Sequence, residues 1–237
     1  WDISSGGYIV GFIFAAALDA TLLGLMYACA RWQPSLSLLL TLRFLEGAAH
    51  LTSLSTLMAL AGDWSGPGRG GRVMGVIGAA LIFGTAFGTP LGGRIGQENP
   101  AFVLLLGAII CVVAAMLGLR LHEAPSRRTP ASLSDTLFLL NHCPRLTTAY
   151  VFGFIERLCV GVIVSTFILY LGEVHHLEPA RKGLLMALFL FPFAILCYPM
   201  GRLTDRWGRA IPMGVGGIAF GLVYALYGVV SGPWLVV

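Results

Sequence analysis

Long, uninterrupted apolar runs are the feature that most constrains this chain. Stretches of about twenty apolar residues recur along its 237 residues, which is the length that a helix needs to cross a bilayer. In hydrocarbon the backbone must satisfy its own hydrogen bonds, so only helices and closed barrels are available. Barrel strands would alternate polar and apolar residues, and these runs do not alternate. The pattern predicts an all-α, polytopic membrane protein.

The balance of apolar and charged residues excludes a soluble globular domain. Hydrophobic residues make up 57% of the chain and charged residues only 11%, whereas a soluble domain carries about 25% charged residues. The net charge of +4 is modest and the basic residues form no long run, so no nucleic-acid partner is expected. The five cysteines are scattered without a CxxC spacing, which predicts reduced, structural thiols. The expected partner of most of the surface is the lipid bilayer.

Turn-forming residues separate the apolar runs and set the limits of the expected spans. Seven spans are predicted, at 8–30, 37–61, 72–95, 101–121, 146–171, 184–203 and 211–230, with the start of an eighth at Pro233. The longest break, 122–145, carries leucines on one helical face, which predicts a short amphipathic helix at the membrane surface; a disordered linker is the alternative. Because the chain starts at Trp1 and has no signal-peptide pattern, we expect a piece of a longer protein.

The distribution of lysine and arginine predicts the orientation. One set of alternate loops holds Arg69, Arg72, Arg120, Arg127, Arg128, Arg145, Arg202, Arg206 and Arg209. The other set holds fewer basic residues, namely Arg31, Arg94, Arg181 and Lys182. The richer set is expected on the cytoplasmic side, which makes the charged stretch GRLTDRWGRA (201–210) a cytoplasmic loop.

Ionisable residues inside the spans are the first candidates for function. They are Asp19, Arg43, Glu46, His50, Glu156 and Arg157. A charge at the centre of a spanning helix costs roughly 2.5–3.5 kcal/mol on insertion scales, and such residues usually face the bundle interior or a water-filled path. All but Asp19 lie on the second and fifth spans. On the second span Arg43, Glu46, His50 and Ser53 share an arc of about 80°, and on the fifth Glu156, Cys159, Thr166 and Tyr170 share a similar arc, as expected of helices that line a cavity.

Each of these residues also has a structural interpretation. Arg43 and Glu46 are three apart and could simply pair with each other. Glu156 lies in mid-span, where a carboxylate commonly carries a proton or binds a cation, and Arg157 is expected to point about 100° away from it. His50 titrates near neutral pH or is a packed, hydrogen-bonded residue. Asp19 is isolated on its span and could meet Arg43 across helices.

No pattern of an enzyme or of a metal site is found. Adjacent His175 and His176, with Glu173 and Glu178 nearby, point in different directions and would chelate poorly. The sequence contains no nucleophile–base constellation, no phosphate-binding glycine loop and no zinc spacing. We therefore expect no catalytic residue, no metal and no cofactor.

Three motifs resemble those of the major facilitator superfamily. The stretch 201–210 is similar to the superfamily's inter-helix loop signature G-x-L-x-D-R-x-G-R, through Gly201, Leu203, Asp205, Arg206, Gly208 and Arg209. Residues 43–47 resemble its fourth-helix motif R-x-x-Q-G, with Glu46 in place of glutamine. The third span resembles its fifth-helix antiporter motif G-x8-G-x3-G-P-x2-G-G. Its glycines are Gly75, Gly84, Gly88, Gly92 and Gly93, whereas Thr89 occupies the proline position.

The resemblance implies a register for the whole chain. Residues 1–121 would be helices 3–6 of the N-terminal six-helix half, and 122–145 would be the cytoplasmic linker between the halves. Residues 146–237 would be helices 7–9 and the start of helix 10 of the C-terminal half. The fold implied is an incomplete major-facilitator-type helical bundle, without helices 1, 2, 11, 12 and most of helix 10.

The resemblance also implies roles for the candidate residues. In the superfamily, helices 4 and 7 line the central cavity, which here are the two spans rich in charge. Glu156 is the first candidate for binding a proton or a charged substrate, followed by Arg43, Glu46 and His50, and then by Asp19, Arg157 and Tyr170. The residues Gly201, Asp205, Arg206, Gly208 and Arg209 would form a cytoplasmic latch for alternating access. The glycines of the third span would let helices pack closely.

The implied function is secondary active transport of a small organic solute in a bacterial inner membrane. Proton-coupled export, as in an antiporter of drug-like molecules, is the favoured form. A uniporter or symporter on the same fold is one alternative. A structural or assembly subunit of a larger membrane complex is the other, and it would bring a protein partner.

Overall fold

The structure is a computed structural model that describes residues 7–30, 32, 35–66, 68–121, 138 and 144–227. These residues form helices and no strand, which confirms the all-α prediction. The helices are α1 (Gly7–Ala30), α2 (Leu36–Trp64), α3 (Gly70–Glu98), α4 (Pro100–Gly118), α6 (Pro144–Glu173), α7 (Pro179–Trp207) and α8 (Ala210–Tyr227). Each of the seven predicted spans falls on one of them. The eighth span, predicted from Pro233, lies outside the described residues. The short helix expected within 122–145 also lies outside them, apart from Phe138, which is helical.

Five helices in the described part are long and apolar enough to cross a membrane, where seven spans were predicted. They are α1, α3, α4, α7 and the Thr147–Glu173 part of α6. The helix α2 falls short because Arg43, Glu46, His50 and its serines and threonines lower its mean hydropathy. In α8 the stretch Ala210–Val223 forms a shorter apolar helix.

Local sequence explains where several helices begin and end. Ser35 caps α2 by accepting a hydrogen bond from the Leu38 amide. Asn99 caps α4 in the same way, and Pro100 occupies the first position of that helix. Both arrangements satisfy amides that have no partner within the helix. The turn residues at the breaks therefore act as helix boundaries.

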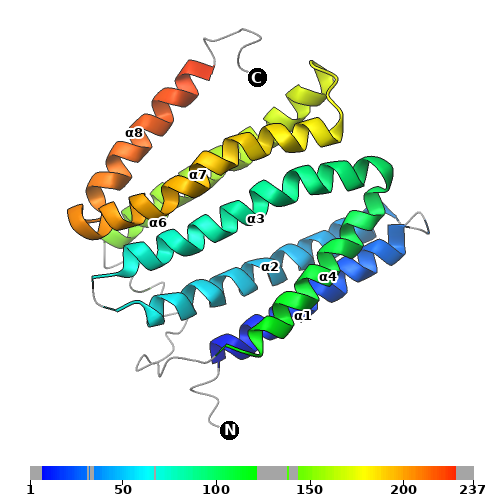
Figure 1. The fold of residues 1–237 in the computed structure, drawn as a ribbon, viewed down its shortest axis with the longest axis horizontal. Helices are drawn as coiled ribbons and strands as arrows, with labels where there is room; N and C mark the ends of the chain where they lie inside the picture. The colour runs from blue at the N-terminus through cyan, green and yellow to red at the C-terminus, as the bar shows by residue number, and fades with distance from the viewer. Residues whose placement is uncertain are drawn as a thin grey trace. The chain divides into compact units, whose positions relative to one another are not determined.

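The described helices fall into two compact units. The first contains α1, α2, α3, α4, α7 and α8, and the second contains α6. Within the first unit, α1 packs against both α2 and α4, α3 packs along α7, and α8 contacts α7 (Figure 1). The predicted division into halves at 122–145 stays a prediction. The first compact unit contains helices from both sides of that segment.

The packed core of the first unit is small. One cluster joins Leu22 and Met26 of α1 with Leu42 and Ala49 of α2, and Ala86 of α3 and Ala194 of α7 are also fully buried. Large apolar side chains face outward, among them Phe14 of α1 and Phe44 of α2, which are 70% and 77% exposed. A protein in water rarely exposes so many large apolar side chains, whereas lipid tails solvate them. The exposed apolar surface is that of an integral, multi-pass membrane protein.

Candidate functional site

The helices α3 and α7 lie against each other along almost their whole length (Figure 1). They run antiparallel, because Gly71 of α3 meets Gly201 of α7 at one end and Gly93 meets Pro179 at the other. A Cβ atom placed on Gly75 would lie only 2.7 Å from the carbonyl oxygen of Cys197. The two backbones therefore touch directly, as small residues allow between helices in a membrane. We call this contact the α3–α7 seam.

The predicted motif glycines differ in what they face. Gly75 and Gly93 lie in the α3–α7 seam, and Gly92 faces Val103 of α4. A Cβ on Gly84 or Gly88 would meet nothing within 4 Å. The motif therefore places only some of its glycines against α7, and the others have room for a methyl group.

Sequence analysis missed two glycines of the seam. Gly71 was assigned to a break between spans, although its four-residue spacing from Gly75 is the signal of close helix packing. A Cβ on Gly71 would clash with the Gly201 carbonyl oxygen. Gly183 lies opposite Thr89 and Pro90 of α3, and no local pattern marks it, because its role depends on which residues α3 places there.

Asp205 of the loop motif caps the N-terminus of α3. Its carboxylate accepts hydrogen bonds from the amides of Gly71, at 2.7 Å, and Arg72, at 3.0 Å. The residue that precedes the helix, Arg69, makes no side-chain cap of its own. The first amides of a helix lack partners within it and carry a partial positive charge, so a carboxylate there is stabilised. A residue of α7 thus supplies the cap that the sequence next to α3 lacks.

The other motif residues surround this cap. Gly201 contacts Gly71 and Gly75, and Gly208 ends α7 with a φ of +79°. That left-handed conformation favours glycine and is typical of the residue that follows a helix. Arg206 and Arg209 are exposed at the same end of α7. The side chain of Arg72 lies 3.7 Å from Asp205, through its Nε atom. Gly201 therefore packs against α3, and Asp205 adds hydrogen bonds between α7 and α3.

The middle and the opposite end of the seam carry different contacts. Phe191 of α7 stacks edge-to-face with Phe83 and Phe87 of α3, with ring centroids 5.8 and 5.1 Å apart. Near the opposite end, the Thr89 hydroxyl donates a hydrogen bond to the Gly183 carbonyl oxygen at 3.2 Å. Thr89 stands where the resembled motif has proline, which carries no hydroxyl. The two helices are therefore hydrogen-bonded to each other near both ends.

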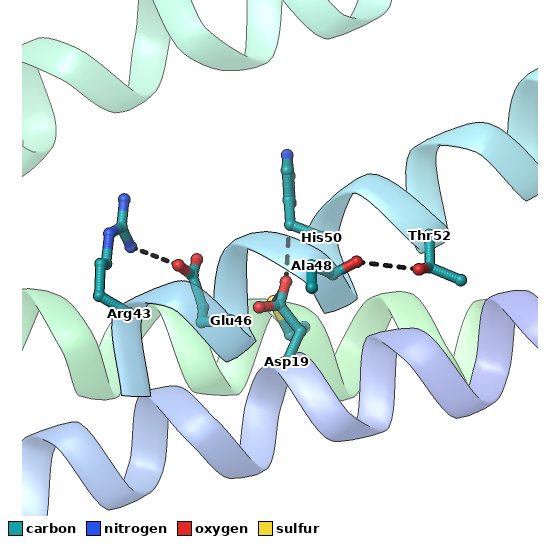
Figure 2. Close-up of polar contacts among 7 residues, drawn as sticks. Asp19, Arg43, Glu46, Ala48, His50 and Thr52 are labelled. Atoms are coloured by element: carbon teal, nitrogen blue, oxygen red, sulfur yellow. Dashed lines mark hydrogen bonds and ion pairs between the residues drawn. The ribbon is translucent and has the colours of Figure 1, made fainter. Parts of the chain in front are cut away.

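A second group of polar residues lies where α1, α2 and α4 meet. It consists of Asp19 of α1, Arg43, Glu46 and His50 of α2, and Cys111 of α4, and we call it the Asp19 cluster. Arg43 donates to Glu46 at 2.6 Å, and His50 Nδ1 lies 3.6 Å from Asp19 Oδ2 (Figure 2). The Cys111 thiol donates to the same oxygen at 3.6 Å. The cluster brings together side chains that are far apart in the sequence.

The structure corrects the partner that sequence analysis considered for Asp19. Arg43 pairs with Glu46 on its own helix, and His50, two turns further along α2, is the residue beside Asp19. Asp19 and Glu46 are buried, with 4% and 9% of their surface exposed. The side chain of His50 is 66% exposed. His50 thus links a buried carboxylate to the surface of the first unit.

The helix α6 carries an ion pair that was not expected. Arg157 donates to both carboxylate oxygens of Glu156, at 2.7 and 3.0 Å. Their positions on the helix were expected to keep the two side chains apart. They pair nevertheless, because the long arginine side chain reaches its neighbour around the helix. Tyr170, near the end of α6, stacks edge-to-face with His175 at 5.0 Å between ring centroids.

Metal-ligand geometry is not found in the described part of the chain. No group of three or more His, Cys, Asp or Glu side chains there is arranged to hold a metal ion. His175 and His176 lie just after α6, where His176 adopts a φ of +50°. The described residues provide a hydrogen-bonded cap between α3 and α7. They also provide two groups of ionisable side chains, which are the Asp19 cluster and the Glu156–Arg157 pair.

Comparison with known families identifies the chain by two matches. A family model described as the Major Facilitator Superfamily matches residues 6–155 and, separately, residues 149–237. No curated protein and no solved structure matched the chain.

Proposed function

This chain belongs to the Major Facilitator Superfamily, and from that premise we propose that it exports a small organic solute by proton-driven alternating access. Membership makes it a multi-pass secondary transporter and not an enzyme. The solute class, the coupling ion, the direction of transport and a bacterial inner membrane as its location are the parts that we propose.

The cap that Asp205 places on α3 is the observation that carries the proposal. Its two bonds to the Gly71 and Arg72 amides exist only while these ends of α3 and α7 touch. Charge-assisted bonds of this kind are stronger than neutral ones, so their formation favours one arrangement of the helices over another. Asp205 and the two amides that it caps lie on the arginine-rich side, which is expected to be cytoplasmic. We infer that the cap holds the cytoplasmic entrance closed and breaks when it opens.

Glu156 is the residue that we propose for proton or substrate coupling. It lies within a candidate membrane span, and Arg157 binds both of its oxygens. A proton on Glu156 would remove the charge that holds Arg157, and would free the guanidinium to bind an anionic group or to move. The glycine run of α3, which resembles the antiporter motif, supports export as the direction.

Transport assays on the full-length protein in proteoliposomes test the coupling. We expect Glu156→Gln to abolish accumulation driven by a proton gradient and to keep solute exchange between equal pH values. Glu173→Gln, which removes a carboxylate from the exposed end of the same helix, serves as the matched control and should retain both activities.

Three outcomes would contradict the proposal in different ways. Full proton-driven accumulation by Glu156→Gln would remove Glu156 from the coupling site. Solute flux with no proton flux in the unmodified protein would indicate a uniporter. A stoichiometric protein partner, together with the absence of stabilisation by any solute of a broad panel, would instead favour a subunit of a membrane complex.

A further inference from the structure

Asp19 is a buried acid whose two carboxylate oxygens have different surroundings. Oδ2 faces both His50 Nδ1 and the Cys111 thiol at 3.6 Å. Oδ1 is buried and has no hydrogen-bond partner among the described residues. An ionised carboxylate in a buried site is normally paired and fully hydrogen-bonded. Asp19 therefore lies in a site that is incomplete for the ionised form alone.

Among the described residues, His50 is the basic side chain that lies beside Asp19 without pairing with another acid. The charge of Arg43 is taken by Glu46 at 2.6 Å. The helices α1 and α4 carry no charged side chain other than Asp19, and the titratable group that α4 brings to the cluster is Cys111. Of the residues placed by the structure, His50 is therefore the one that can balance Asp19, and it does so only when protonated.

Counting protons gives the net charge of the cluster. With His50 neutral and both acids ionised, the Asp19 cluster carries one net negative charge in a candidate span. With one proton added, on His50 or on Asp19, the cluster is neutral. Net charge inside a membrane is costly, and one added proton removes it.

We propose that Asp19 and His50 form a binding site for a single proton between α1, α2 and α4. With the proton on His50 Nδ1, the two residues form an ion pair. When it transfers to Asp19 Oδ2, both become neutral and the pairing across α1 and α2 is lost. The inference rests on the proposed proton coupling for its role in transport, whereas the binding of the proton is independent of it.

The side chains of Asp19 and His50 differ in how much of their surface is exposed. Asp19 has 6% of its side chain exposed and His50 has 66%. The neighbouring helices therefore shield the carboxylate, whereas the imidazole lies at the surface of the first unit. Figure 2 shows the His50 side chain on α2 with Asp19 below it on α1. Cys111 donates to the carboxylate and helps to hold it in place.

Infrared spectroscopy of the full-length protein in nanodiscs tests the site directly. A protonated carboxyl group absorbs separately from a carboxylate, so the pH at which its band disappears can be followed. We expect a band that is lost in Asp19→Asn and kept in Glu98→Gln, which removes an exposed carboxylate at the end of α3. His50→Gln, a substitution at an exposed side chain that should not prevent folding, is expected to change the pH at which the band disappears.

Transport of the same variants separates the site from its role. We expect Asp19→Asn to keep solute exchange and to lose proton-driven accumulation. A carboxyl band unchanged in Asp19→Asn, or a titration unchanged in His50→Gln, would overturn the binding site. Normal proton-driven accumulation by Asp19→Asn would overturn its role in coupling. Transport by the unmodified protein without any proton dependence would instead refute the proposed coupling, and the infrared result would still decide the site.

Discussion

At the scale of single residues, Asp205 connects two parts of the chain that are distant in sequence. It bonds amides 134 and 133 positions before it, at the start of α3. Its partners are backbone groups, so no side chain near α3 shows the connection. The family motif marks Asp205, but the motif alone does not say which helix end it binds.

Removal of this carboxylate gives the first prediction. Asp205→Ala leaves two amides at the start of α3 without their acceptor. A hydrogen bond to a charged group contributes about 1.5–3 kcal/mol to the free energy of unfolding. We expect a lower unfolding temperature and faster labelling of a cysteine placed at Arg69. Gln97→Ala, at an exposed position on the same helix, should change neither. Unchanged labelling in Asp205→Ala would show that the cap does not hold these helix ends together.

At the scale of elements, the glycine motif of α3 divides into residues that face α7 and residues that do not. A methyl group on Gly75 would meet the Cys197 carbonyl oxygen, whereas one on Gly84 would meet nothing within 4 Å. The helical periodicity of the motif is visible in the sequence. Which of its faces meets a neighbour depends on the rotation of α3 relative to α7, which no local pattern specifies.

This difference gives the second prediction, with its control in the same motif. Gly75→Ala should force α3 and α7 apart and destabilise the protein by about 1–3 kcal/mol, as overpacking does. Gly84→Ala should be neutral or stabilising by up to about 1 kcal/mol, because alanine favours helix over glycine. Thermal unfolding in detergent compares the two. Equal effects of both substitutions would refute the close contact at Gly75.

At the scale of the whole molecule, alternating access requires helices that separate and rejoin. In the structure, α3 and α7 are held near both ends, by Asp205 at one and by the Thr89–Gly183 hydrogen bond at the other. A transporter that rocks about its binding site must open at least one end at a time. The α3–α7 seam is therefore the contact whose permanent closure should stop the cycle.

A disulfide across the seam gives the third prediction. A Cβ on Gly78 would lie 3.7 Å from the Cys197 sulfur and 4.0 Å from its Cβ, which is within the usual Cβ–Cβ range of a disulfide. In a background without the other cysteines, Gly78→Cys should cross-link to native Cys197 on oxidation. Transport should stop and return on reduction.

The matched control for the cross-link is Gly84→Cys in the same background. It lies on the same helix but faces open space, so oxidation should leave it uncross-linked and active. Mass spectrometry of peptides detects the bond. Full transport by an efficiently cross-linked Gly78→Cys protein would mean that α3 and α7 move as one body.

The sequence by itself determined the class of fold and the approximate position of the seven described helices, although α7 continues to Trp207, into the stretch 201–210 that was expected to be a loop. Apolar run length and the need for internal backbone hydrogen bonds are local properties, and turn residues such as Ser35 and Asn99 act as caps where they stand. The motifs also indicated the family. Even the Arg43–Glu46 pair was foreseen, because residues three apart on a helix are neighbours.

Only the tertiary structure decided which side chains meet across helices. It placed His50 rather than Arg43 beside Asp19, and it brought Asp205 to the N-terminus of α3. Such contacts depend on how each helix is rotated and shifted against another that is distant in the sequence. In lipid, where no hydrophobic force selects between helix faces, close backbone packing makes that choice, and it depends on both helices at once.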